Sequence, residues 1–146
     1  MYLPLFIDVK GKRALVVGFG KVGHRRAMKL LAAGAKVEAI DKRKIRVADN
    51  IRFFQKELLI EKLPSFKKYD IVIVATDDAK LNSAIAKKAM LEGCLVNRVD
   101  HFRGGNTIFP AVVRISEITL AFTTFGKNPK LAKMAKEVVK RGIPRN

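Results

Sequence analysis

The chain has 146 residues, of which 49% are hydrophobic, and its 30 lysines and arginines outnumber its 13 aspartates and glutamates. This composition excludes a disordered chain and predicts one domain, and no apolar run approaches the roughly 20 residues of a membrane-spanning helix. The net charge of +17 favours an anionic partner, although a solvated lysine-rich surface would give the same number.

The N-terminal segment and the cysteine content bear on the cellular compartment. The first residues carry no basic stretch ahead of their apolar patch and no cleavage site typical of a signal peptide. Cys94 is the single cysteine, and its apolar surroundings favour a buried thiol over a reactive one. We therefore expect a cytoplasmic protein that does not bind membranes.

Buried strands alternate with helices over the first hundred residues. Apolar runs predict strands within residues 13–19, 35–41, 50–57, 69–78 and 94–100. The spacing of apolar residues predicts helices over residues 22–33 and 79–93. This order predicts an α/β fold with an open, Rossmann-like parallel sheet and right-handed crossovers.

The pattern changes after Asp100. Residues 101–106 predict a loop, and residues 107–115 and 118–126 predict two strands that pair antiparallel across a polar turn. Residues 128–142 predict an amphipathic helix that Asn128 caps and Pro129 begins. We therefore divide the chain into a domain of residues 1–102 and a smaller segment of residues 103–146.

Three glycines in the stretch VVGFGKVG separate the first strand from the first helix. Gly18 permits a tight turn, Gly20 lets the backbone approach a pyrophosphate, and Gly23 lets the helix pack close to the strand. The N–H groups of the first helical turn, at Lys21 and Val22, would then face the phosphates. This arrangement predicts a dinucleotide site, against the alternative of a turn that binds nothing.

Asp41, at the end of the second predicted strand, bears on the choice of dinucleotide. A carboxylate there accepts hydrogen bonds from the 2′-hydroxyl of a ribose and repels a 2′-phosphate, which favours NAD over NADP. The residues that follow, Lys42, Arg43 and Lys44, are basic and would instead suit the phosphate of NADP. On balance the sequence predicts NAD as the cofactor.

The stretch ATDD follows the fourth predicted strand. Thr76 lies where the nicotinamide half of a dinucleotide would pass, and we expect it to contact the cofactor. Asp77 and Asp78 directly precede a predicted helix, where aspartate is favoured. We therefore expect these two carboxylates to cap the helix rather than to take part in catalysis.

Four stretches together resemble the precorrin-2 dehydrogenase/sirohydrochlorin ferrochelatase family, which includes the N-terminal part of siroheme synthase. They are VVGFGKVGHRRAMKLLAAGAKV, VATDDAKLN, VNRVD and FPAVVRISEITLAFTTFGKNPKLAK. The resemblance implies NAD-dependent oxidation of precorrin-2, an acidic tetrapyrrole, to sirohydrochlorin, and in some members insertion of Fe²⁺. It also implies a homodimer formed through the strand segment after the Rossmann-like domain. Many relatives continue into a helical domain that this sequence does not contain, which leaves iron insertion open.

The resemblance also assigns a catalytic residue. The family's catalytic aspartate lies in an Asn-x-x-Asp motif, and here that motif ends at Asp100. A carboxylate at the end of a parallel strand lies where ligands bind in such sheets and can take a proton as hydride leaves a substrate. Basic or titratable residues near this position are candidates for the substrate carboxylates: Arg98, His101, Arg103 and Lys127. Phe125 departs from the family, which more often has glycine there, so we expect a different local backbone.

Two other functions remain as alternatives. A non-catalytic NAD-sensing domain of the potassium-transport type shares the glycine motif, the aspartate and the TDD stretch, but not the segment FPAVVRISEITLAFTT. A nucleic-acid-binding domain would explain the charge, but the sequence has no helix-turn-helix signature or zinc-ligand pattern. We therefore predict an enzyme with NAD as cofactor, without metal ligands and without a nucleic-acid partner.

Overall fold

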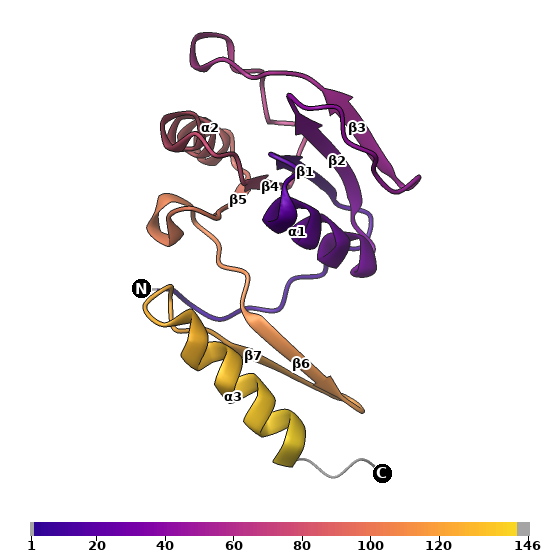
Figure 1. The fold of residues 1–146 in the computed structure, drawn as a ribbon, viewed down its shortest axis with the longest axis vertical. Helices are drawn as coiled ribbons and strands as arrows, with labels where there is room; N and C mark the ends of the chain where they lie inside the picture. The colour runs from indigo at the N-terminus through magenta and orange to yellow at the C-terminus, as the bar shows by residue number, and fades with distance from the viewer. Residues whose placement is uncertain (1, 143–146) are drawn as a thin grey trace. The chain divides into compact units, whose positions relative to one another are not determined.

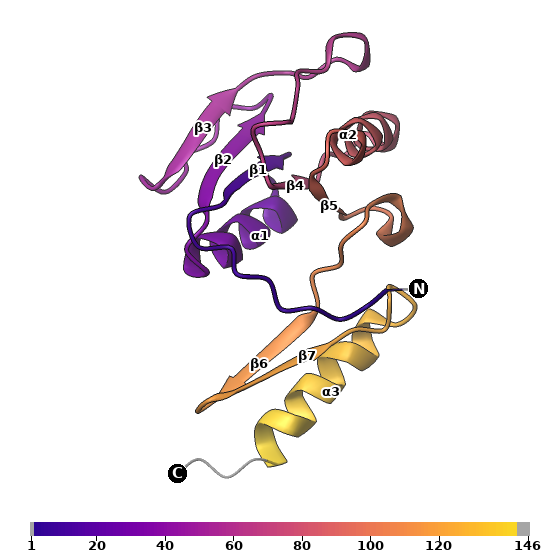
Figure 2. The same cartoon turned by 180° about the vertical axis from the view of Figure 1, so that it is seen from behind.

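In the computed structural model, which describes residues 2–142, the chain consists of two units that divide between Thr107 and Ile108. The first unit is a five-stranded parallel sheet in the order β3-β2-β1-β4-β5, flanked by helices (Figure 1). Figure 2 shows it from behind, with β3 at one edge of the sheet and β5 at the other. Its strands are β1 (Arg13–Val17), β2 (Lys36–Asp41), β3 (Ile51–Gln55), β4 (Ile71–Val74) and β5 (Leu95–Arg98).

The central strands are buried on both faces, which explains their continuous apolar runs. Strand β1 pairs with β2 on one side and with β4 on the other, so that Leu15 lies opposite both Glu38 and Val72. Leu15 and Val17 belong to the core beneath α2 (Ala79–Leu91), whereas Val16 contacts α1 (Lys21–Ala32) through Gly23. Because side chains alternate along a strand, α1 and α2 cover opposite faces of the sheet.

Two short 3₁₀ helices complete the first unit: η1 (Ile60–Lys62) and η2 (Phe102–Gly104). Cys94, directly before β5, is buried, and its thiol donates to the carbonyl oxygens of Phe66 and Tyr69. Burial raises the pKa of the Cys94 thiol. The expected burial of this thiol is therefore confirmed.

The second unit is an antiparallel pair, β6 (Ala111–Ile115) and β7 (Ile118–Phe122), with helix α3 (Pro129–Gly142) packed along it (Figure 1). The side chain of Asn128 accepts a hydrogen bond from the N–H of Leu131 at 3.0 Å, so the predicted cap is confirmed. Within residues 2–142, no helix is long and apolar enough to span a membrane.

These elements confirm the predicted fold class, and the differences lie at element ends. Strand β6 begins at Ala111 rather than at residue 107. Pro110 has no N–H to give to a ladder, and the N–H groups of Asn106 and Thr107 both donate to the carbonyl oxygen of Val96 in β5. Residues 106 and 107 are therefore held by the parallel sheet.

Candidate functional site

A pocket of about 550 Å³ lies at the carboxyl ends of β1, β2 and β4. It is lined by the turn at Gly18 and Gly20, by residues 40–43 at the end of β2, by the segment of residues 56–61 and by the loop of residues 75–78. Its volume falls within the range of small-molecule sites, and the carboxyl edge is where open parallel sheets bind ligands.

Two glycines make the turn between β1 and α1 possible. Gly18 has φ +88°, and a Cβ built there would lie 2.5 Å from the carbonyl carbon and oxygen of Ala75. A Cβ at Gly23 would lie 2.0 Å from the carbonyl oxygen of Gly18. Both positions therefore require glycine for the close approach of backbone to backbone.

Gly20 is different, because a Cβ there would meet only Arg43 Nη2 at 3.8 Å. Glycine at position 20 is therefore not needed to avoid a clash with backbone atoms; it leaves open space in the pocket. Gly20 is also the N-cap of α1, and no side chain caps that helix or places an acid in its first turn, at Lys21 and Val22. In α2, by contrast, the Asp78 carboxylate accepts from the N–H groups of Lys80 and Leu81.

The start of α1 thus suits an external anion, whereas the start of α2 is already capped by the protein. A helix N-terminus combined with a glycine cradle is the arrangement that holds pyrophosphate groups. The residues present therefore fit a dinucleotide. Both Asp77 and Asp78 were expected to cap α2, and this is confirmed for Asp78 only. Asp77 lines the pocket instead.

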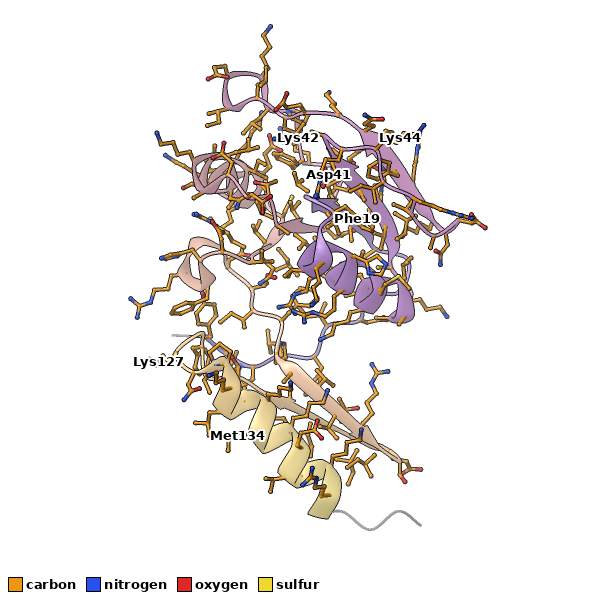
Figure 3. All side chains as sticks on the ribbon, in the orientation of Figure 1. Phe19, Asp41, Lys42, Lys44, Lys127 and Met134 are labelled. Carbon is orange, nitrogen blue, oxygen red and sulfur yellow. The ribbon has the colours of Figure 1, made fainter. Side chains whose placement is uncertain are left out.

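Asp41 lies at the end of β2, close to Phe19, with Lys42 and Lys44 in the segment that follows (Figure 3). One carboxylate oxygen accepts from the N–H of Phe19 at 2.8 Å and from Arg43 Nη2 at 2.9 Å. The other accepts from the backbone N–H and the Nε of Arg43, at 2.9 and 3.0 Å. These hydrogen bonds, led by that from Arg43, hold the pKa of Asp41 well below its usual range.

The carboxylate that the sequence assigned to a ribose is therefore already occupied. A carboxylate has about four acceptor positions, and here four donors use them. The Asp41 side chain is 5% exposed but that of Arg43 is 57% exposed, so Arg43 can return to water at small cost. Withdrawal of the Arg43 guanidinium would free two acceptor positions on Asp41, while the two backbone N–H groups would stay in place.

Thr76 lines the pocket and belongs to a hydrogen-bonded network at the start of α2. Its hydroxyl donates to Asn82 Oδ1, and its carbonyl oxygen accepts from Asn82 Nδ2 at 2.9 Å. The same hydroxyl accepts from the N–H of Asp78 at 3.2 Å. The loop that would contact the nicotinamide half is therefore fixed by a fully buried asparagine.

Asp100 lies just beyond β5 and is held by Arg98 in a bidentate pair, with N–O distances of 2.8 and 2.9 Å. The guanidinium also donates to the carbonyl oxygen of Ala79 at 3.2 Å. Gly104 makes room for it, since a Cβ there would lie 2.6 Å from Arg98 Cδ. The hydrogen bonds from Arg98 hold the pKa of Asp100 below its usual range.

The remaining predicted residues lie at different places. His101 and Arg103 flank Phe102 in η2, with the His101 ring stacked 6.3 Å from the Phe102 ring and the Arg103 guanidinium 5.3 Å from it. Lys127 belongs to the second unit (Figure 3). The pocket itself brings together Gly18, Gly20, Asp41 and Thr76, and Asp100 and Arg98 lie outside its lining.

Three features of the site were missed by the sequence reasoning. They are the pairing of Asp41 with Arg43, the pairing of Asp100 with Arg98, and the burial of Asn82. Each pair joins residues two apart at the end of a strand, where the following two residues form a bend. The patterns Asp-x-Arg and Arg-x-Asp therefore carried a usable signal, whereas nothing in the sequence indicated the burial of Asn82.

Comparison with known proteins agrees with this geometry. The family model NAD_binding_7, described as "Putative NAD(P)-binding", matches residues 5–111. The chain belongs to this NAD(P)-binding family. Membership in the family supports a nicotinamide dinucleotide as the cofactor and does not distinguish NAD from NADP.

Individual relatives confirm the resemblance drawn from the sequence motifs. Siroheme synthases of Photorhabdus laumondii subsp. laumondii and Buchnera aphidicola subsp. Acyrthosiphon pisum are 33% and 36% identical over 149 residues, which cover 98% of this chain in each case. The chain spans about a third of their length, 31% in both. The solved structure of SirC, a precorrin-2 dehydrogenase, has a TM-score of 0.76 and 28% identity, covering 99% of this chain and 72% of SirC.

Proposed function

We propose that this chain is an NAD-dependent dehydrogenase that oxidises precorrin-2 to sirohydrochlorin in siroheme biosynthesis. The observation that supports the proposal most is the likeness to SirC, because it extends over 99% of the chain and so includes both units. A likeness confined to the parallel sheet would support only a nucleotide-binding domain. The siroheme synthases support the same activity through their names and their coverage of this chain.

The cofactor proposed is NAD⁺, held with its pyrophosphate at the first turn of α1 and its adenosine ribose at Asp41. Gly20 leaves the pyrophosphate its space, and Arg43 withdraws from Asp41 to release the acceptors that a ribose diol needs. When bound, this cofactor supplies the acceptor for a hydride. The chain supplies the binding and the orientation, with the Thr76 loop placed beside the nicotinamide half.

Asp100 is the proposed catalytic residue. Loss of a hydride from the substrate leaves one proton to be removed, and a carboxylate can accept it or hold the pyrrole N–H from which it departs. Because its pKa is lowered by Arg98, Asp100 is ionised at neutral pH but is a weak base while that pair persists. A substrate carboxylate that draws Arg98 away would make Asp100 a stronger base.

The substrate proposed is a tetrapyrrole with several carboxylates, which agrees with the excess of basic residues. A positive field raises the capture rate of such an anion, and charge-assisted hydrogen bonds hold it. Arg98 and Arg103, on either side of Asp100 in the chain, are the candidates within the first unit. His101 and Lys127 remain predicted contacts.

We also propose that the protein forms a homodimer through its second unit. Leu131, Met134 and Val138 on α3 are 52%, 63% and 68% exposed, and no residue of that helix is buried. An apolar stripe of this kind is stabilised when a second copy covers it. Sedimentation equilibrium should show a dimer for the wild type and a monomer for Met134→Glu, and a monomeric wild type would contradict the proposal.

The activity is tested by mixing the purified protein with precorrin-2 and NAD⁺ and following the absorbance of NADH. We expect NADH and sirohydrochlorin in equal amounts. Asp100→Asn should lose most of this rate and retain its affinity for NADH, whereas Asp49→Asn, an exposed aspartate before β3, serves as the matched control. Binding of NADH without turnover of authentic precorrin-2 would contradict the proposal and favour a regulatory NAD-sensing domain. Adding Fe²⁺ and recording the product spectrum then tests iron insertion.

A further inference from the structure

Arg98 lies against the turn that follows β5, with little of its side chain in solvent. The side chain is 12% exposed, and a Cβ at Gly104 in η2 would lie 2.6 Å from Arg98 Cδ and 2.9 Å from Nη1. Gly104 does not have a positive φ, so its backbone conformation does not require glycine. The missing side chain instead leaves space beside one end of the Arg98 guanidinium.

The guanidinium of Arg98 has unused donors at that end. A guanidinium has five N–H donors, and here Nε and Nη2 donate to the two oxygens of Asp100, while Nη2 also donates to the carbonyl oxygen of Ala79. Within residues 2–142, Nη1 makes no hydrogen bond. Its N–H groups are therefore available to an acceptor that does not belong to the described part of the chain.

We propose that Arg98 Nη1, in the space left by Gly104, binds one carboxylate of the substrate. The position that a Cβ would take at Gly104 is 2.9 Å from Nη1, which is the ordinary separation of a nitrogen donor and an oxygen acceptor. A carboxylate oxygen therefore fits where an alanine methyl group would block it. The inference rests on the proposed function for the identity of the ligand as a polycarboxylate, and it assigns one contact with that ligand to a single nitrogen atom.

The backbone around η2 is held in place, so the space at Gly104 is part of the fold. The N–H of Gly104 donates to the carbonyl oxygen of His101 at 2.8 Å. Two residues further on, the N–H of Asn106 donates to the carbonyl oxygen of Val96 at 3.0 Å, and the Asn106 side chain accepts from the N–H of Val96 at 2.6 Å. A side chain at position 104 would therefore push the Arg98 side chain aside rather than lift the turn.

The charges around Nη1 suit a carboxylate ligand. Asp100 neutralises Arg98 in the free protein, and Arg103 in the same turn is exposed and adds a positive charge. A carboxylate bound to Nη1 would share the guanidinium with Asp100 and weaken that ion pair. Substrate binding would thereby begin the displacement of Arg98 that makes Asp100 a stronger base.

The test measures binding of sirohydrochlorin, the polycarboxylate product of the proposed reaction, to the full chain by absorbance, without turnover. Gly104→Ala fills the space beside Nη1, and Arg98→Ala removes Cδ, Nε and Nη1, the three atoms that the new methyl group would meet. The double variant shows whether Gly104 acts through Arg98. Gly93→Ala, before β5 begins, is the matched control, because Gly93 has φ +89° and nothing within 4 Å of its Cβ position. This change strains the backbone without filling a space beside another residue.

Gly104→Ala and Arg98→Ala should each bind sirohydrochlorin about tenfold more weakly than wild type, the loss expected for one charge-assisted hydrogen bond. In the Arg98→Ala background, Gly104→Ala should change this affinity by less than about twofold, because the atoms that it displaces are already absent. NADH affinity should stay within about twofold of wild type in Gly104→Ala. Gly93→Ala should lower the unfolding midpoint and leave sirohydrochlorin binding unchanged.

The ¹⁵N signals of the Arg98 guanidinium in the wild type give a second measurement, and they are assigned by their absence in Arg98→Ala. These signals should shift when sirohydrochlorin is added, so this measurement decides if Gly104→Ala does not fold. Unshifted Arg98 signals at saturation, equal affinities of Gly104→Ala and wild type, or a full tenfold effect of Gly104→Ala in the Arg98→Ala background would each overturn the proposal. A wild type that does not bind sirohydrochlorin would contradict the proposed function itself, and the inference with it.

Discussion

Replacing Arg43 by alanine tests how far a single ion pair determines the relative affinities for NADH and NADPH. In the wild type, Arg43 supplies three of the four hydrogen bonds on the Asp41 carboxylate, two of them from its guanidinium at 3.0 and 2.9 Å. Arg43→Ala keeps the backbone N–H and that of Phe19 and removes the guanidinium. Asp41 then has two free acceptor positions and an uncompensated charge facing the pocket.

These changes act oppositely on the two cofactors. NADH presents a ribose diol that donates to the freed acceptors, so its affinity should stay the same or tighten by up to about threefold. NADPH presents a 2′-phosphate that meets an unpaired carboxylate and has lost its nearest cation. Because the Arg43 side chain is 57% exposed, solvent screens this effect, and we expect the affinity ratio to change by about tenfold rather than by orders of magnitude more.

The assay is a fluorescence titration of wild type, Arg43→Ala and Lys44→Ala with NADH and with NADPH at constant, low ionic strength. Lys44→Ala is the matched control, since it removes the same charge from the same segment but does not line the pocket. Lys44→Ala should lower the affinities for NADH and for NADPH slightly and to the same extent. A dissociation-constant ratio, NADPH over NADH, that changes by less than about twofold in Arg43→Ala would refute the reasoning, as would a ratio that falls.

Three further predictions concern the same unit. Gly20→Ala should fold normally but bind NADH at least about tenfold more weakly. Gly23→Ala should instead lower the unfolding midpoint strongly, because its Cβ would lie 2.0 Å from the Gly18 carbonyl oxygen. Thermal unfolding and NADH titration of both variants distinguish the two roles. The lowered pKa of Asp41 stabilises the fold above about pH 4, the pKa of an unfolded aspartate, and this stability is lost as the pH falls toward the folded pKa. Asp41→Asn should therefore show a smaller loss of stability than wild type in urea unfolding between about pH 6 and about pH 3, and an equal loss would contradict this account. Cys94 should react with a thiol reagent only after unfolding, so rapid labelling of the native protein would contradict its burial.

The sheet could be predicted from the sequence because burial on both faces leaves a continuous apolar signal. Residues 14–17 are all buried, and so are residues 71–74, and both stretches stand out as apolar runs. Strand ends depend instead on which backbone groups find partners. Residues 107–110 have a strand-like composition, but the N–H groups of Asn106 and Thr107 donate to the carbonyl oxygen of Val96, and the sequence does not show that these donors are taken.

Phe125 illustrates the same limit in the second unit. We expected a different local backbone there because the family more often has glycine, but Phe125 has φ +52°, in the region that favours glycine. Its N–H donates to the Thr123 hydroxyl at 3.0 Å, and the Thr124 hydroxyl accepts from Asn128. The turn is thus held by two threonine hydroxyls, which offset the roughly 1–2 kcal/mol that a left-handed conformation costs an ordinary residue.

At the site, the sequence predicted two functional carboxylates but not their electrostatic state. Asp41 and Asp100 were expected as acceptors, yet each is paired with an arginine two residues away along the chain. Neither carboxylate therefore presents a net negative charge to an approaching anion, although the two are the acids on which binding and catalysis are proposed to depend. The proposed dinucleotide and polycarboxylate substrate would therefore not be repelled by these two carboxylates. Under the proposed function, a ligand group must displace the arginine before either carboxylate can accept its hydrogen bonds or proton, so charge pairing in the free protein would compete directly with ligand binding at both positions.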